Sequence, residues 1–197
     1  MTAIHPERIE GAWDSGFALD YHTVSSVFIG HDAYGHPMFE TEYTELGALV
    51  YRLKSQKDRS VVAGIIETVV QFVTTTWNPG FSVIVPVPPS NVRAEQPVAL
   101  LAGALAERLK LPIRSAAVTK LRRTEQLKNV NDYAERMRIL EGNFSADPNV
   151  VSTQKVLLFD DLYRSGATMN SVARALREIG QAAEIHALAL TRTRVHR

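Results

Sequence analysis

The chain has 197 residues, of which 45% are hydrophobic and 22% are charged. This is typical of one globular domain with a substantial core, with room for a small appended lobe. The sequence contains no cysteine, which excludes disulfides, thiolate catalysis and cysteine-ligated zinc. No apolar run approaches the ~20 residues that span a bilayer, and residues 1–16 lack the basic start and apolar centre of a signal peptide. We therefore expect a cytoplasmic protein without a membrane span.

Charge is distributed unevenly along the chain, although the formal net charge is only +1. Residues 1–60 contain five Lys or Arg against nine Asp or Glu, whereas residues 114–138 contain seven against three. The C-terminal tail adds Arg192, Arg194 and Arg197. A basic segment in a near-neutral protein either faces phosphates or is a solvated loop, and charge alone does not separate these alternatives.

The N-terminal part predicts a β-hairpin. Residues 23–29 and 38–43 are rich in β-branched and aromatic side chains, and the Gly and Pro between them favour a turn. We expect this hairpin to lie across the main domain. His31, Asp32 and His36 at the turn are candidate metal ligands, but turn histidines are more often simply exposed.

Strands and helices are then predicted to alternate. Apolar spacing indicates helices over residues 44–54 and from a cap at Ser60 to about residue 73. Residues 82–87 read as a strand, 95–110 as a helix and 113–119 as a second strand, which makes a right-handed parallel βαβ unit. Residues 120–131 are polar and basic, and Asp132 begins another helix. A basic connection of this length favours a cover that closes over a phosphate ligand, with Lys120, Arg122 and Arg123 as its cations.

Residues 156–169, VLLFDDLYRSGATM, carry the clearest chemical signal. The apolar run 156–159 predicts a buried parallel strand, and Asp160 and Asp161 follow at its carboxyl end. Gly166 lets the backbone approach a ligand, and the N–H groups at the start of the next helix suit a phosphate. Adjacent carboxylates can accept hydrogen bonds from vicinal hydroxyls or hold a hydrated Mg²⁺ indirectly. Together these features predict a ribose 5-phosphate site.

A helix from Met169 that ends at Gly180 and a last strand over residues 184–190 complete the pattern. Because strands and helices alternate over residues 82–190, the fold class is α/β, with a doubly wound and mostly parallel sheet flanked by helices.

The 156–169 stretch resembles the phosphoribosyl pyrophosphate (PRPP) motif of type I phosphoribosyltransferases, with Arg164 where that family usually has a small residue. Three further stretches, residues 45–59, 84–113 and 120–144, resemble segments of the ComF family, whose members are associated with DNA uptake. Many ComF proteins begin with a four-cysteine zinc ribbon, which this chain lacks. Residues 89–91 also differ from the basic stretch that often follows Pro-Val-Pro in that family.

This resemblance implies a type I phosphoribosyltransferase fold, with residues 1–45 as an N-terminal β-hairpin or hood region and residues 46–197 as the α/β core. It implies that Asp160 and Asp161 are the catalytic carboxylates and that Mg²⁺ is the cofactor, held indirectly through the substrate rather than by a protein metal site. The implied substrate-binding residues are Leu162, Tyr163, Arg164, Ser165, Gly166, Ala167, Thr168, Pro88, Pro89, Ser90, Lys120, Arg122 and Arg123.

Three functions remain open at this stage. The first is a Mg²⁺-dependent phosphoribosyltransferase that uses PRPP and an unidentified acceptor. The second is a non-catalytic ComF-like accessory protein of DNA uptake that binds single-stranded DNA or competence proteins. The third is a generic α/β domain in which the paired acids have another role. The sequence leaves the oligomeric state open, and a homodimer is among the states it allows.

Overall fold

The computed structural model describes residues 2–89, 96–121, 133–140 and 142–194. Its centre is a five-stranded sheet in the order β1-β2-β9-β8-β5. Strands β2 (Ser15–Tyr21), β9 (Glu184–Arg192), β8 (Lys155–Tyr163) and β5 (Val83–Pro86) are parallel, and β1 (Glu7–Arg8) is antiparallel to β2. The prediction of a mostly parallel α/β sheet is confirmed.

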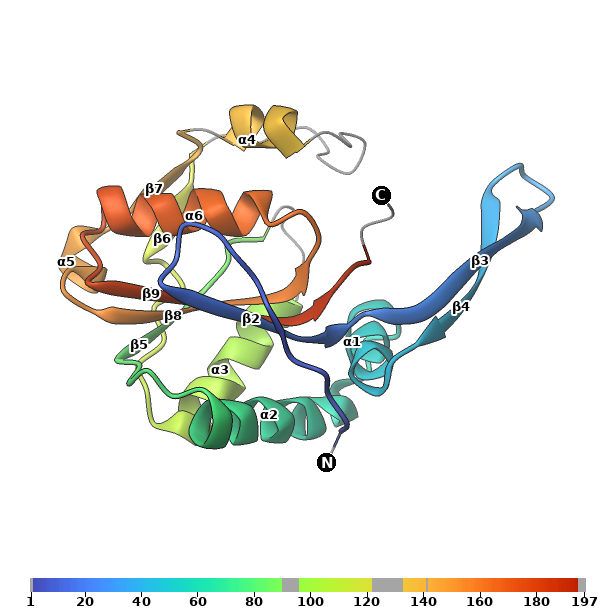
Figure 1. The fold of residues 1–197 in the computed structure, drawn as a ribbon, viewed down its shortest axis with the longest axis horizontal. Helices are drawn as coiled ribbons and strands as arrows, with labels where there is room; N and C mark the ends of the chain where they lie inside the picture. The colour runs from blue at the N-terminus through green and yellow to red at the C-terminus, as the bar shows by residue number, and fades with distance from the viewer. Residues whose placement is uncertain (1, 90–95, 122–132, 141, 195–197) are drawn as a thin grey trace.

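Helices cover both faces of this sheet (Figure 1). Helix α6 (Ala167–Glu178) lies on one face, and α1 (Glu45–Ser55), α2 (Val62–Gln71) and α3 (Pro97–Leu109) lie on the other. Side chains alternate along β8, so Val156 and Leu158 pack with α6 while Leu157 and Phe159 pack with α1, α2 and α3. A strand buried on both faces has the continuous apolar sequence that was read from residues 156–159.

Strand β2 inserts the N-terminal segment into the central sheet beside β9. Ala18 and Leu19 are fully buried, one on each face. Residues 1–45 therefore supply a core strand as well as the hairpin, while the predicted domain boundary at residue 45 stays a prediction.

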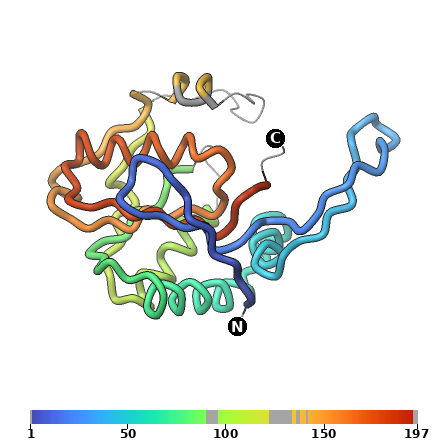
Figure 2. The backbone as a smooth tube through the Cα atoms, viewed as in Figure 1, coloured from blue at the N-terminus to red at the C-terminus, as the bar shows by residue number. Residues whose placement is uncertain are grey.

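The predicted hairpin is present as β3 (Thr23–His31) and β4 (Pro37–Tyr43), which pair antiparallel. The expectation that it lies across the main domain is wrong, because it projects away from that domain (Figures 1 and 2). Only His22 separates β2 from β3, so the chain continues outward past the carboxyl edge of the sheet. The Asp32 carboxylate accepts hydrogen bonds from the N–H groups of Tyr34 and His36 and organises the turn.

Helix α1 confirms the first predicted helix, and the Thr44 hydroxyl caps it by accepting from the N–H of Gly47 at 3.0 Å. The second helix differs at its start. A short 3₁₀ turn, η1 (Arg59–Val61), precedes α2, and the cap of that turn is Asp58 rather than Ser60. A π-helical turn, η2 (Phe72–Thr76), ends this helical segment.

The predicted strand over residues 113–119 is not formed as a unit. Ile113 makes a single parallel bridge to Ile84, after which the N–H of Ala117 bonds to the carbonyl of Arg114 in a turn. Strand β6 (Val118–Lys120) instead pairs with β7 (Phe144–Ala146) in a separate antiparallel sheet. The turn breaks the strand because residues 114–116 are exposed and have no apolar face to bury.

The remaining helices are α4 (Tyr133–Leu140) and α5 (Pro148–Val151). The predicted start at Asp132 lies outside the described residues. None of the helices in the described ranges is long and apolar enough to cross a bilayer.

Candidate functional site

The candidate site lies at the carboxyl edge of the central sheet. Strands β2, β9, β8 and β5 are parallel, so their carboxyl ends meet at one edge, where ligands bind in open α/β sheets. This edge brings together residues from four distant parts of the sequence: Tyr21 and His22 at the end of β2, Pro88 and Pro89 after β5, residues 160–168 from β8 and its loop, and Thr191 to Arg194 at the end of β9.

Asp160 and Asp161 belong to the last part of β8, which extends to Tyr163 and not only to residue 159. Because adjacent residues of a strand point to opposite faces, the two carboxylates leave the strand on different sides. Asp161 is 7% exposed, and its Oδ2 atom lies 2.9 Å from the Nζ of Lys54 on α1. Asp160 is half-buried and accepts a hydrogen bond of 2.8 Å from the N–H of Asp161. The pair is therefore a structured part of the edge.

The two carboxylates have unequal electrostatic surroundings. Burial, and then the negative charge of Asp161, raise the pKa of Asp160 to about 8, although the N–H of Asp161 and the Lys54 ammonium oppose the shift. At neutral pH Asp160 is then mostly protonated, so it can donate one hydrogen bond as well as accept others. Asp161 has the lysine as its direct counter-ion.

This difference predicts how stability depends on pH. The pKa of Asp160 is raised from 3.8 to about 8 in the folded state, so the folded protein binds more protons than the unfolded chain between these values. The contribution of Asp160 to the free energy of unfolding should therefore fall as pH rises from about 4 to 8. We expect Asp160→Asn to gain stability relative to the wild type at pH 8 compared with pH 5, as measured by urea denaturation. A difference that does not change with pH would contradict this assignment.

The loop after β8 forms a tight turn into α6. Gly166 is the N-cap of α6 with φ = 76°, a left-handed conformation that favours glycine. The first i→i−4 bond of α6 runs from the N–H of Asn170 to the carbonyl of Gly166, so the N–H groups of residues 167–169 have no acceptor within the helix. The Ser165 hydroxyl lies 3.5 Å from the N–H of Ala167, and Arg164 is exposed beside the turn. Such a helix start suits an anion.

Sequence reasoning missed several residues at this edge. The Nδ1 of His22 lies 3.1 Å from the Thr191 hydroxyl, which donates to the carbonyl of Asp161 at 3.2 Å. Burial, and then the charge of Lys54, lower the pKa of His22, while the charge of Asp161 opposes this shift. His22, Thr191 and Lys54 therefore surround Asp161. Lys54 had been read only as the end of a helix, and no local pattern marks it as a partner of residue 161.

Cations and tyrosines also meet at the end of β9. The Arg192 guanidinium lies 5.5 Å from the Tyr21 ring and 6.0 Å from the Tyr163 ring, and that of Arg194 lies 4.4 Å from Tyr21. The Nε of Arg192 is buried and has no hydrogen-bond partner among the described residues. The tail arginines had been noted from the sequence, but only the parallel register places Arg192 beside Tyr163.

The other predicted ligand residues do not all lie at this edge of the sheet. Pro88 is half-buried and Pro89 is exposed beyond β5. Lys120 ends β6 in the separate small sheet, and burial lowers its pKa. Ser90, Arg122 and Arg123 lie outside the described residues, so the predicted basic cover stays a prediction.

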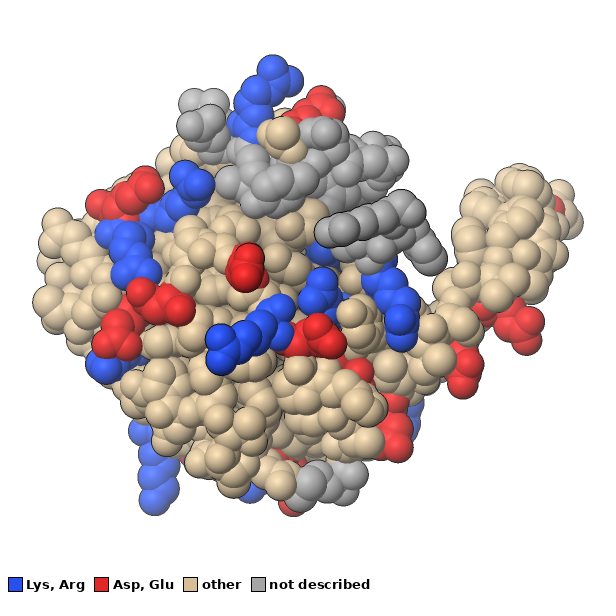
Figure 3. Space-filling model, viewed as in Figure 1, with Lys and Arg blue, Asp and Glu red and all other residues tan. Residues whose placement is uncertain are grey.

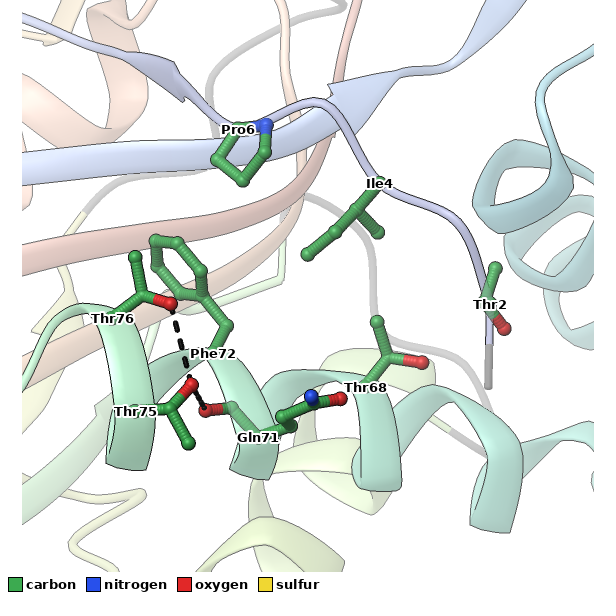
Figure 4. A pocket seen from close by; sticks show the side chains of 8 residues that line it. All are labelled: Thr2, Ile4, Pro6, Thr68, Gln71, Phe72, Thr75 and Thr76. Atoms are coloured by element: carbon green, nitrogen blue, oxygen red, sulfur yellow. Dashed lines mark hydrogen bonds between the residues drawn. The ribbon is translucent and has the colours of Figure 1, made fainter.

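A shallow pocket of about 350 Å³ lies away from this edge, between the N-terminal segment and α2 (Figure 4). Ile4, Pro6 and Phe72 line it with several threonines. The Thr68 and Thr75 hydroxyls donate to carbonyls of their own helix, those of Gly64 and Gln71. These groups are already satisfied, so we assign this pocket no ligand.

Comparison with known proteins gives one relative by sequence. Over 111 residues the chain is 34% identical to the competence protein ComFC of Bacillus subtilis (strain 168). This part of the chain is ComF-like. The alignment covers 56% of the chain and 45% of that protein, so the chain spans about half the length of the relative it matches. The resemblance predicted from the sequence motifs is confirmed. No family model matches the chain.

Solved structures with similar folds include phosphoribosyltransferases. Adenine phosphoribosyltransferase from Leishmania tarentolae is 12% identical with a TM-score of 0.46 and covers 95% of this chain and 94% of its own. The enzyme from Thermoanaerobacter pseudethanolicus is 14% identical with a TM-score of 0.45, and the match covers 86% of this chain and 95% of that enzyme. Glutamine PRPP amidotransferase from B. subtilis is 18% identical with a TM-score of 0.48, and the match covers 77% of this chain and 33% of that protein. These are distant similarities, and the site assignment rests on the geometry of the chain itself.

Proposed function

We propose that this protein binds PRPP or a related ribose 5-phosphate ligand with Mg²⁺ at the carboxyl edge and transfers the phosphoribosyl group to an acceptor. One observation carries the proposal. A single segment, residues 160–168, delivers two carboxylates from the end of β8 and then turns at Gly166 into the open start of α6. A diol acceptor and an anion site are thus joined by a short loop, so one sugar 5-phosphate could engage both.

The 5-phosphate would occupy the turn. The N–H groups of residues 168 and 169 and the hydroxyls of Ser165 and Thr168 would supply donors, and the exposed Arg164 would add positive charge. The left-handed Gly166 allows this tight turn, where a side chain would collide with the Tyr163 ring.

The ribose hydroxyls would meet the carboxylates. Asp160, when protonated, can both donate to and accept from a hydroxyl, whereas Asp161 keeps Oδ1 for the ligand while Oδ2 stays with Lys54. The pair also fits a hydrated Mg²⁺, which prefers oxygen ligands and keeps several waters. Within the described residues no group of three His, Asp or Glu side chains converges, so Asp160 and Asp161 would hold the ion through the substrate and water. When bound, the ion would neutralise charge on the pyrophosphate.

In the transfer step, the bond from the ribose C1 to the pyrophosphate oxygen breaks, a lone pair of the acceptor forms the new bond to C1, and the proton that the acceptor loses passes to water. The pyrophosphate leaves with the bonding electron pair, and positive charge develops on the sugar. The negative charge of Asp161 close to the sugar and cations close to the leaving group would stabilise this charge separation. Arg192 lies beside the site, and Lys120, Arg122 and Arg123 are the predicted cover. The protein supplies positioning and charge rather than a nucleophile.

Calorimetric titration with PRPP and Mg²⁺ tests the proposal. We expect the wild type to release binding heat and Asp160→Ala and Asp161→Asn each to raise the Kd at least about tenfold, since the first removes the hydrogen-bonding group and the second removes the negative charge. The matched control is Asp14→Asn, because Asp14 bonds to the N–H of Ile185 at the amino end of β9, far along the strand from the site. Equal heats in the wild type and both site variants would mean that PRPP does not bind at the carboxyl edge of the sheet.

A second candidate is a ComF-like accessory protein in DNA uptake that binds but does not turn over a ligand. Two features favour it: Asp161 is already paired with Lys54, and Arg192 and Arg194 lie with Tyr21 at the surface edge, where cations and aromatic rings suit single-stranded DNA. Pyrophosphate release with a panel of nucleobases and amines separates transfer from binding. Salt-dependent gel shifts with single-stranded DNA test the accessory role.

A further inference from the structure

The projecting hairpin β3–β4 exposes an unusual amount of apolar surface. Of eleven large apolar side chains that are exposed in the described part of the chain, seven belong to it: Val24, Val27, Phe28, Ile29, Tyr34, Met38 and Phe39. Val27, Phe28 and Phe39 are each more than 50% exposed. An isolated two-stranded hairpin is marginally stable in water, and clustered apolar side chains on a projection mark an interaction surface.

The charge of the hairpin argues against nucleic acid as its partner. Residues 23–43 contain Asp32, Glu40 and Glu42 but no Lys or Arg. Figure 3 shows the projection as mainly uncharged, with acidic groups along one side. A phosphate backbone would be repelled by this surface, which therefore suits a protein partner better than nucleic acid.

The two strands of the hairpin differ at their outer edges. Strand β4 begins with Pro37 and carries Glu40 and Glu42, which are features that discourage pairing with another strand. Strand β3 has nine residues, TVSSVFIGH, without a formal charge or a proline. Its central residues 25–28 pair regularly with residues 39–42, and register shifts occur only on either side of them. Within the described chain, β3 has no second neighbour.

We propose that β3 pairs antiparallel with β3 of a second copy of this chain, which forms a four-stranded sheet in the order β4-β3-β3-β4 across a two-fold axis near Val27. Antiparallel pairing of the same strand is the isologous contact that a two-fold dimer requires. Val27 is the central residue of β3, so this register aligns the two uncharged edges along their whole length.

Charge and cross-strand side-chain contacts both suit this occupant. The two β4 strands would be three strand spacings apart, about 14 Å, which is beyond the ~8–10 Å screening length at physiological salt, so their glutamates would not repel strongly. Across the axis Val27 would face Val27 of the second copy, and cross-strand pairs of β-branched and aromatic side chains stabilise a sheet.

The test is the oligomeric state of Val27→Lys compared with Met38→Lys. Val27 lies opposite Glu40 within its own hairpin, so the new ammonium has a partner there and the fold should be kept. In the pair of copies, however, two ammonium groups would meet at the axis. Met38 is 40% exposed on the outer strand β4, and its substitution adds the same charge away from the axis.

We expect sedimentation over a wide concentration range to show a dimer for the wild type and for Met38→Lys, and a dissociation constant raised at least tenfold for Val27→Lys. Circular dichroism verifies that each variant is folded. Hydrogen exchange should show the main-chain N–H groups of residues 25–28 better protected in the wild type than in Val27→Lys. The proposal would be overturned if the wild type stays monomeric, even if it binds other proteins. It would also be overturned if the Val27→Lys variant dimerises as well as the wild type.

Discussion

Gly166→Ala is expected to raise the Kd for PRPP by about 10- to 100-fold, because a lost hydrogen bond to a charged group costs about 1.5–3 kcal/mol. Two physical causes act together. The φ of 76° is unfavourable for alanine, and a Cβ at this position would collide with the ring of Tyr163. The turn would have to shift, and the N–H groups at the start of α6 would shift with it. We expect a loss of about 1–3 kcal/mol in the free energy of unfolding as well.

A double-mutant cycle separates these causes. In a Tyr163→Ala background the ring is absent, so Gly166→Ala should cost less binding and less stability there than in the wild type. The matched control is Gly64→Ala, because Gly64 lies in α2 and a Cβ there has open space around it. Calorimetry measures binding, and urea denaturation measures stability. If Gly166→Ala binds PRPP as the wild type does, the phosphate is not held at this turn.

Phe159→Ala is expected to lower the free energy of unfolding by about 3–5 kcal/mol, which is a large part of the stability of a single domain. Phe159 is a residue of β8, and its side chain is fully buried against the helices α1, α2 and α3. Its removal leaves a cavity directly before Asp160 in the same strand. Thermal and urea denaturation measure the loss.

The comparison variant for this prediction is Phe28→Ala in the projecting hairpin. Phe28 is 52% exposed, so the same truncation should change the stability of the monomer by less than about 1 kcal/mol. Similar losses for the two variants would mean that β8 is not the centre of the core. Measurements at low protein concentration keep any association of the hairpin from contributing.

The segment from β8 to α6 could be predicted from the sequence because its signals are local. Four consecutive apolar residues indicate a strand buried on both faces, and Gly166 marks the turn that only glycine adopts easily. The acidic pair and the turn lie within a few residues of one another, so their proximity needs no tertiary information. The hairpin was readable for the same reason, since its turn residues lie between two β-branched runs.

Other expectations failed where local patterns were ambiguous. Residues 113–119 are apolar enough for a strand, but the turn at residues 114–117 redirects the chain and β6 pairs with β7 instead. The hairpin was expected to lie across the main domain, but it projects away from it. Its direction is set by β2, whose place in the central sheet the sequence did not reveal.

By itself, then, the sequence determined the α/β class and the carboxylate and turn segment, because short-range periodicity and glycine placement encode them. Only the tertiary structure decided which side chains surround that segment. Lys54 reaches Asp161 from α1, His22 arrives at the end of β2, and Arg192 is aligned with Tyr163 by strand register. These contacts join residues far apart in the chain, and a contact of that kind depends on strand order and register, which no local pattern specifies.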